Sequence, residues 1–270
     1  MNTTQKIIKY LAIAFAICLI ISIFMGIYHT IGAIGGAVTH SGGNGLNINK
    51  YPNTANILSI DIGASKLKIV EGTSLKVETN NKYIATTQDF NKLSVTEKSH
   101  SIFNTKGKEE VIVYIPKDMT FDKVYISNGA GSINIENITT QDLELELGAG
   151  ELTIDQITSL NNTDIDGGVG EANINNAYLN NLDLDMGVGE FTITGSITGK
   201  SKIDAGVGEL NINLKDNKDN YSIYTETGIG SIRIDGNSVK NETTYGMGNN
   251  KIDIDGGVGS INIRFLENNN

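Results

Sequence analysis

The chain has 270 residues, a formal net charge of -10 and a pI near 4.8. Its 21 lysines and arginines make it a poor candidate for binding nucleic acid, where affinity depends on neutralised phosphates, or anionic lipid headgroups. The only cysteine, Cys18, lies in the apolar N-terminal stretch, so no disulfide stabilises the rest of the chain.

The first predicted element is a membrane-spanning helix. Residues 7–28 are apolar except for Lys9, and a spanning helix needs about 20 such residues. Lys6 and Lys9 precede the stretch and the next lysine is Lys50, so the positive-inside bias predicts a cytoplasmic N-terminus and an extracytoplasmic remainder. A cleaved signal peptide is the alternative, because small residues that suit processing follow the apolar core. We assign residues 1–29 to a cytoplasmic end and a single-pass anchor.

The next segment, residues 30–55, is predicted to be a tether, because six of the residues from 32 to 45 are glycine. Residues 56–128 form a predicted irregular β region, since apolar and polar residues alternate there in short runs separated by turn residues. The clearest runs are 57–62, 66–70, 74–77 and 111–116. Pro116 should end the last of them, because proline cannot donate a hydrogen bond to a neighbouring strand.

A regular repeat follows over residues 129–266, and a polar tail, 267–270, closes the chain. The repeat is marked by Gly-x-Gly turns that begin at Gly129, Gly148, Gly168, Gly187, Gly206, Gly228 and Gly257. The first five steps are 19, 20, 19, 19 and 22 residues, and the last is 29 with an inserted Gly246-Met247-Gly248 loop. Periods of this size predict stacked units that bury a shared core.

Apolar residues keep a fixed phase with these turns. Six residues after the first glycine of each turn there is always an isoleucine: Ile135, Ile154, Ile174, Ile193, Ile212, Ile234 and Ile263. Other apolar positions alternate with polar ones on both sides of the turn, but the alternation shifts by one residue across it, as a corner between two strands requires. We therefore predict an all-β fold, a single-stranded β-solenoid with rungs of about 19–20 residues, and an antiparallel sandwich as the alternative.

Two motifs resemble a known bacterial family. The first is the strand–Pro–strand passage from Val111 to Val124, and the second is the run of Gly-[Ala/Val]-Gly-[Glu/Ser] turns after it. Together they resemble the putative-adhesin family of β-strand repeat proteins, a domain of unknown function, over residues 57–265. The resemblance implies an extracytoplasmic β-helix-like fold on a bacterial cell surface, and it carries no catalytic or ligand-binding residues over to this chain.

Acidic residues also follow the repeat. One residue after the turn, four consecutive units carry Glu151, Glu171, Glu190 and Glu209, and further acids occupy the second and fourth positions before it. In stacked units these become columns of like charges about 4.8 Å apart, which repel by about 1 kcal/mol per neighbour in water. Calcium could relieve that repulsion, so the four glutamates are the candidate metal ligands. The simpler hypothesis is a solvated face that keeps the protein soluble, without a cofactor.

Enzymatic activity is not expected. Its chemistry would need a paired acid and base, or a basic residue beside clustered carboxylates. The three histidines lie in the membrane flank, the tether and a polar loop, and the only arginines are Arg233 and Arg264. The asparagine pairs between the strands are predicted to serve left-handed turns.

The functional hypothesis is therefore a membrane-anchored, adhesin-like interaction module. Its partner would be a cell-envelope polymer, or alternatively a membrane protein through which the chain acts as an envelope-stress sensor or regulator. Adhesion predicts exposed aromatic residues along one face, and the candidates are Tyr178, Tyr221, Tyr224 and Tyr245. These tyrosines could equally pack at the rim of the core.

Overall fold

The computed structural model describes residues 47–98 and 109–266. Apart from Lys98, these residues belong to one unit of the chain, which is built almost entirely from 21 hydrogen-bonded β-strands. Within the described residues, its helical structure is one short 3-10 turn, Lys218–Asn220. The predicted anchor and Cys18 lie outside the described residues, and within those residues we find no helix long and apolar enough to cross a membrane.

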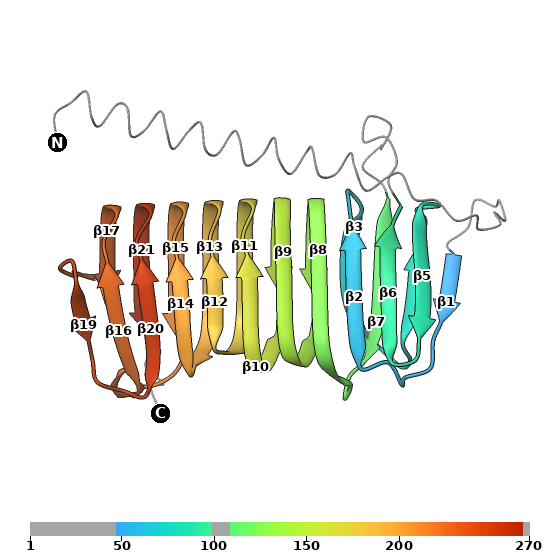
Figure 1. Cartoon of the computed structure of the whole chain (residues 1–270), viewed down its shortest axis with the longest axis horizontal. Helices are drawn as coiled ribbons and strands as arrows, with labels where there is room; N and C mark the ends of the chain where they lie inside the picture. The colour runs from blue at the N-terminus through green and yellow to red at the C-terminus, as the bar shows by residue number, and fades with distance from the viewer. Residues whose placement is uncertain (1–46, 99–108, 267–270) are drawn as a thin grey trace, which may run out of the picture. The chain divides into compact units, whose positions relative to one another are not determined.

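Each regular rung contains three strand segments, shown by β9 (Ile138–Ile154). We call residues 142–147 of β9, which lead into the glycine turn, the first arm, residues 151–154 the second arm, and residues 138–140 the third arm. All three pair in parallel with β8 (Thr120–Ile135), for example Leu145 with Ile126 and Ile154 with Ile135. Parallel pairing of successive windings is solenoid-like, and it is inconsistent with the antiparallel sandwich (Figure 1).

The first arms of all rungs form one continuous ladder. Its order is β5 (Ile84–Asp89), β6 (Lys92–Glu97), β2 (Ile57–Ile62), β8, β9, β10 (Ile157–Asp166), β12 (Leu182–Asp185), β14 (Lys200–Asp204), β20 (Asn250–Asp255), β16 (Tyr221–Glu226) and β19 (Thr243–Tyr245). The rung that contains β2 thus continues the regular ladder, although its sequence lacks the Gly-x-Gly turn.

The second arms form a matching ladder. Its order is β1 (Asn47–Lys50), β4 (Lys76–Thr79), β7 (Glu110–Pro116), β3 (Lys66–Gly72), β8, β9, β11 (Val169–Asn180), β13 (Val188–Thr198), β15 (Val207–Leu214), β21 (Val258–Phe265), β17 (Ile229–Ile234) and β18 (Asn237–Ser238). Both ladders therefore place the same rungs side by side, which aligns equivalent residues of the repeat.

The last two rungs are stacked in the reverse of their chain order. The C-terminal pair β20–β21 stands between β14–β15 and β16–β17, as its red colour shows in Figure 1. Ile263 is paired with Ile212 on one side and with Ile234 on the other. The rung that ends the ladder is consequently not the last one in the sequence.

This order can be tested with cysteine pairs in a Cys18→Ser background. Glu209 and Ser260 are register partners, so the pair Glu209→Cys with Ser260→Cys should form a disulfide on mild oxidation. Ser231 is two rungs from Glu209, about 9.6 Å at the usual strand spacing, so Glu209→Cys with Ser231→Cys should not crosslink. Mass spectrometry of oxidised protein measures both pairs, and crosslinking of the second pair alone would contradict the reversed order.

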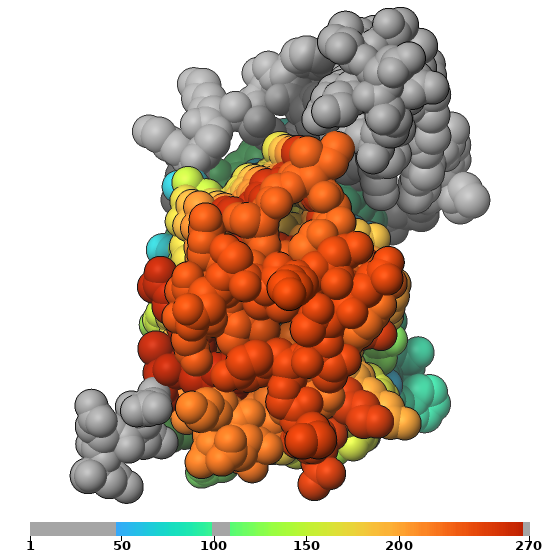
Figure 2. Space-filling view, turned by 90° about the vertical axis from the view of Figure 1, so that its left-hand side faces the viewer, coloured from blue at the N-terminus to red at the C-terminus, as the bar shows by residue number. Residues whose placement is uncertain are grey.

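Short antiparallel strands terminate both ends of the ladders. β5, β4 and β1 do so at one end, and β18 and β19 at the other. Figure 2 looks onto the second end, which is covered mostly by orange residues of the rung and loop that precede the red C-terminal strands. Such strands interrupt the parallel pattern and so discourage addition of further chains at the sheet edge.

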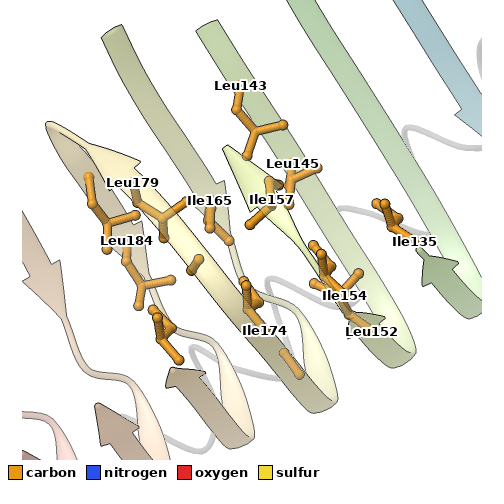
Figure 3. Close-up of a cluster of buried hydrophobic side chains, with 14 of the residues drawn as sticks. Ile135, Leu143, Leu145, Leu152, Ile154, Ile157, Ile165, Ile174, Leu179 and Leu184 are labelled. Atoms are coloured by element: carbon orange, nitrogen blue, oxygen red, sulfur yellow. The ribbon is translucent and has the colours of Figure 1, made fainter. Parts of the chain in front are cut away.

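The core lies between the arms and consists of the predicted apolar columns. All seven predicted isoleucines, from Ile135 to Ile263, are buried, with exposed fractions of 2% or less. Figure 3 shows Ile135, Ile154 and Ile174 from successive rungs following one another along this interior. Truncating one buried isoleucine to alanine would cost about 2–5 kcal/mol, so these columns are a principal source of stability.

The structure extends or corrects three features of the sequence analysis. β1 falls inside residues 30–55, which the composition assigned to a tether, and it pairs with β4 because its backbone completes the exposed edge of that strand. The β5–β6 hairpin was not predicted. The strand predicted at 111–116 is confirmed as β7, and Pro116 is its last residue.

Candidate functional site

The glycine turns are set by the spacing of the rungs. Gly170, the second glycine of its turn, has a φ of +143°, and a Cβ atom on it would lie 1.9 Å from the carbonyl oxygen of Gly150 in the adjacent rung. A Cβ on Gly168 would lie 1.7 Å from the carbonyl oxygen of Gly148. Backbone therefore meets backbone directly at each turn, and these glycines are corners of the stack.

The residues between the two glycines form an apolar column at the surface, whose members are exposed or half-buried. In stacking order its members are Ala130, Ala149, Val169, Val188, Val207, Val258 and Ile229. Val169 is 45% exposed and Ile229 is 36% exposed. The tips of the turns thus present side chains without charge, bordered on both sides by glycines.

A different turn closes one end of the glycine columns. The backbone N–H groups of Gly63, Ala64 and Ser65 donate to one carboxylate oxygen of Glu97, at 2.8, 3.1 and 3.4 Å. The side-chain amide of Asn81 donates to the other oxygen at 2.8 Å. Three successive N–H groups around an anion form a nest. Sequence analysis missed this contact, since Glu97 is 32 to 34 residues away and no local motif marks it.

The four predicted glutamates are brought into register. Glu151, Glu171, Glu190 and Glu209 are direct partners in successive rungs, and all four are exposed. Asn262 donates to Glu209 at 3.2 Å. Within residues 47–98 and 109–266, no group of three or more His, Cys, Asp or Glu side chains is arranged to hold a metal ion. Calcium binding by these glutamates remains a prediction.

A second acidic face covers the outside of the first arms. One column contains Glu146, Asp166, Asp185, Asp204, Asp255 and Glu226 in stacking order. The column beside it contains Glu144, Asp164, Asp183, Lys202, Asp253 and Tyr224. Lys202 interrupts the second column and lies 2.6 Å from the carboxylate of Asp204. The first column therefore continues through six successive rungs without a base, whereas Lys202 divides the second.

Two aspartates on this acidic face have raised pKa values. The pKa of Asp164 is raised, first by partial desolvation and then by repulsion from Asp183 and Glu144. Partial desolvation and repulsion from Asp164 and Asp185 likewise raise the pKa of Asp166. These carboxyl groups bind protons more readily in the folded chain than in the unfolded chain, where the Asp pKa is near 3.8.

A pH dependence follows from these shifts. Because an acid with a raised pKa destabilises the fold when ionised, stability should increase as the pH falls through the raised pKa values toward 3.8, the value in the unfolded chain. Glu78 has the opposite effect on stability, because its hydrogen bonds from Lys76 and Tyr114 lower its pKa. The stability that it contributes is lost only when the pH falls below its ordinary pKa of 4.5. We expect maximal stability at mildly acidic pH.

Urea unfolding at steps from pH 7 to pH 4.5 would measure this dependence. The double variant Asp164→Asn with Asp166→Asn should be more stable than wild type at pH 7, by about 0.5–1 kcal/mol, and should show a weaker pH slope. A free energy of unfolding that decreases steadily from pH 7 to pH 5 would show that repulsion on this face is unimportant.

A calcium titration separates site binding from screening. If the carboxylates form only a solvated face, CaCl₂ and NaCl at matched ionic strength should raise the melting temperature of the β unit to the same extent, because both screen repulsion. A larger increase with calcium that is lost in the Glu151→Gln, Glu171→Gln, Glu190→Gln, Glu209→Gln variant would establish a calcium site in that column.

Two of the asparagine pairs, 175–176 and 180–181, have the predicted left-handed residue. Asn181 has a left-handed φ of 46° and Asn176 a φ of 43°. The Asn181 amide donates to the backbone oxygen of Asn161 at 2.8 Å and accepts from the backbone of Lys200 at 3.0 Å. It therefore links three successive rungs at the corner between the third and first arms.

The candidate aromatic residues do not line one face. Tyr178 is 41% exposed on the third arm of β11, whereas Tyr224 lies on the first arm of β16. Tyr221 is buried, which corrects the expectation of an exposed ring, because its hydroxyl donates to Asp216 at 2.9 Å and its ring packs on Phe265. Tyr245 stacks on the same phenylalanine. The last two tyrosines thus help to close the end of the core.

Comparison with known proteins gives the family. The family model described as Toastrack DUF4097 matches residues 54–263, which span both the irregular and the regular β regions. The chain belongs to the Toastrack DUF4097 family. The resemblance carried by the strand–Pro–strand passage and the Gly-x-Gly turns is therefore confirmed.

Three solved structures of similar proteins come from bacteria. A putative cell adhesion protein from Clostridium sporogenes is 18% identical, with a TM-score of 0.43, and the match covers 82% of this chain and 99% of that one. A putative adhesin from Bacteroides fragilis is 17% identical, with a TM-score of 0.46 and coverage of 82% and 98%. A third, from Parabacteroides merdae, is 15% identical, with a TM-score of 0.32 and coverage of 83% and 98%. No curated protein matches the chain.

Proposed function

We propose that this Toastrack protein is a non-catalytic interaction module, anchored by residues 7–28 in the cell membrane and displayed on the extracytoplasmic side. The observation that carries the proposal is the register of the carboxylates: parallel stacking aligns exposed acids in three columns over successive rungs. Such a surface suits a long partner with positive groups at regular intervals, because each added rung repeats the same contact.

The fold supports a binding role more than a catalytic one. The repeat faces carry rows of identical groups, and general acid–base chemistry needs unlike groups with different pKa values at one place. Arg233, one of the two arginines, lies on the second arm of β17, where it donates to Ser231 at 3.1 Å. A charged, regular surface on a rigid stack is the arrangement that recognition of a cell-envelope polymer would use.

Crosslinking in intact cells tests this function. The full chain would be crosslinked on the cell surface, purified and analysed by mass spectrometry. Two variants, each with one set of acidic residues replaced by uncharged amides, would be compared with the wild type. One carries Glu151→Gln, Glu171→Gln, Glu190→Gln and Glu209→Gln on the second arms, and the other carries Glu144→Gln, Asp164→Asn and Asp183→Asn on the first arms. Recovery of an envelope polymer that decreases in one variant supports the module and identifies its binding face.

The same experiment distinguishes the interaction module from the alternative role as an envelope-stress sensor or regulator. In the alternative role, the chain would act as a sensor or regulator through a partner protein in the membrane. One stoichiometric membrane protein in the crosslinked material would therefore support a sensor or regulator. Recovery of neither a polymer nor a protein, or protease resistance of the β unit in intact cells that disappears on lysis, would contradict an exposed interaction module.

A further inference from the structure

A buried asparagine stands where the first regular glycine turn begins. Asn128 is only 5% exposed, and neither its Oδ1 nor its Nδ2 atom has a hydrogen-bond partner in the protein. Its register partners are Ile62 on one side and Leu147 on the other, both apolar. A complete side-chain amide is thus enclosed between hydrophobic neighbours, and it ought to cost stability unless something bonds to it.

A cavity lies beside this side chain. Its volume is 40 Å³, and the residues around it include Asn128, Gly131, Ile133, Leu147, Ala172 and Met186. One cause of the cavity is the small side chain of Ala172, which stands between the larger Leu152 and Phe191 in the column of second arms. The hollow is lined by residues of the glycine turns and is partly open beside them, and Asn128 forms part of its wall.

The size and polarity of the cavity define what can occupy it. One enclosed water needs about 10–15 Å³ on this measure, so the space admits about three waters and no larger organic molecule. A metal cation would need several oxygen ligands close together, and Asn128 supplies one. Glu151, Glu171 and Glu190 also border the cavity, but within the described residues no group of three or more acidic, His or Cys side chains is arranged to hold a metal ion. An ion would also lose its hydration against the walls formed by Ile133 and Leu147. Water alone offers both a donor and an acceptor in that volume.

We propose that this cavity is a binding site for ordered water, held by the Asn128 side chain. Asn128 Oδ1 accepts a hydrogen bond from one water and Nδ2 donates to the same or a second one, so that the buried amide is satisfied. An unpaired buried polar group destabilises the folded chain, and the bound water removes that penalty. The backbone groups of the turns that line the cavity complete its hydrogen bonding.

The site is measurable by magnetisation transfer from water. In the full chain in detergent micelles, long-lived water should give nuclear Overhauser effects to the Asn128 side-chain amide and to the backbone amides of Gly131 and Gly150. Asn128→Leu should abolish them, and it should fold because Leu147 occupies the same position one rung along. Asn134→Leu is the matched control, since Asn134 is exposed on the same strand and the same change there should leave the effects intact.

Two results would overturn the site. One is the absence of any water effect at the Asn128 amide of the wild-type protein, and the other is an effect at Gly131 that persists unchanged in Asn128→Leu. A crystal structure of the wild-type protein at a resolution that shows ordered water is the second measurement. Density that places the Asn128 amide on protein partners, with no water within hydrogen-bond distance, would also exclude the proposal.

Discussion

Replacing Gly170 by alanine is expected to lower the free energy of unfolding of the β unit by more than about 4 kcal/mol, which is an exceptionally large effect for one substitution. The added Cβ would lie 1.9 Å from the carbonyl oxygen of Gly150, and the φ of +143° is one that L-residues rarely adopt. Neither atom can move away as a flexible side chain would, because both belong to the backbone of hydrogen-bonded rungs. The rungs would have to separate at the turn, which breaks neighbouring ladder bonds as well.

Gly236 provides the control for this experiment. Its φ is also positive, at +77°, but a Cβ on it would meet nothing within 4 Å. Gly236→Ala should therefore cost only the conformational strain, about 1–2 kcal/mol. Thermal and urea unfolding of both variants would give the two free energies. Equal effects would mean that backbone strain, and not the close approach of the rungs, is what requires glycine in the turns.

Deleting residues 249–270 is the second change with a large expected effect. It removes β20 and β21, and with them the buried side chains of Ile252, Ile254, Ile261 and Ile263, each contributing about 2 kcal/mol. Because this rung stands in the interior of the stack, the loss should also unpair β16–β17 on one side and expose β14–β15 on the other. We expect a loss of more than about 8 kcal/mol and aggregation through the exposed edges.

Hydrogen exchange would report which strands are lost. In the truncated chain the amides of β16 and β17 should exchange much faster than in wild type. Deletion of residues 267–270 alone is the control, since these follow the last described strand and should leave the exchange rates unchanged. A truncated chain that keeps β16–β17 protected would show that this rung can move onto β14–β15, which would contradict the requirement for the C-terminal rung.

The charged columns and the buried isoleucine columns act on stability in opposite directions. In-register stacking places the Ile columns inside and the acids outside, so the same register that buries Ile154 against Ile174 also brings Glu151 beside Glu171. The hydrophobic term is larger, about 1.5–3 kcal/mol per buried isoleucine against about 1 kcal/mol for a solvated pair of like charges. The fold can therefore hold a repulsive surface, and that surface is then available to a partner of opposite charge.

Much of this architecture is encoded locally. The period of the Gly-x-Gly turns, the isoleucine six residues later and the shift of alternation across the turn are properties of single rungs, each repeated several times. Repetition makes the signal strong, so the sequence alone identified the all-β class, the core columns and the four aligned glutamates. The burial of Ile135, Ile212 and Ile263 and the register of Glu151 with Glu171 agree with it.

Contacts between distant segments could be found only in the tertiary structure. Nothing near Glu97 indicates that it binds the N–H groups of the turn at Gly63, because nest formation depends on how β6 pairs with β2. The position of Asn128 beside a cavity likewise depends on the small size of Ala172, two rungs away.

The order of the last rungs is the clearest case. The sequence determined that residues 221–234 and 250–265 each form a rung, because each carries its own turn and apolar phase. It could not determine which of the two stands next to β14–β15, since both offer the same glycines and isoleucines to that edge. The tertiary structure decided it. The antiparallel strands β18 and β19 pair with β17 and β16, so that rung is the one whose outer edge is closed, and the C-terminal rung fills the place between.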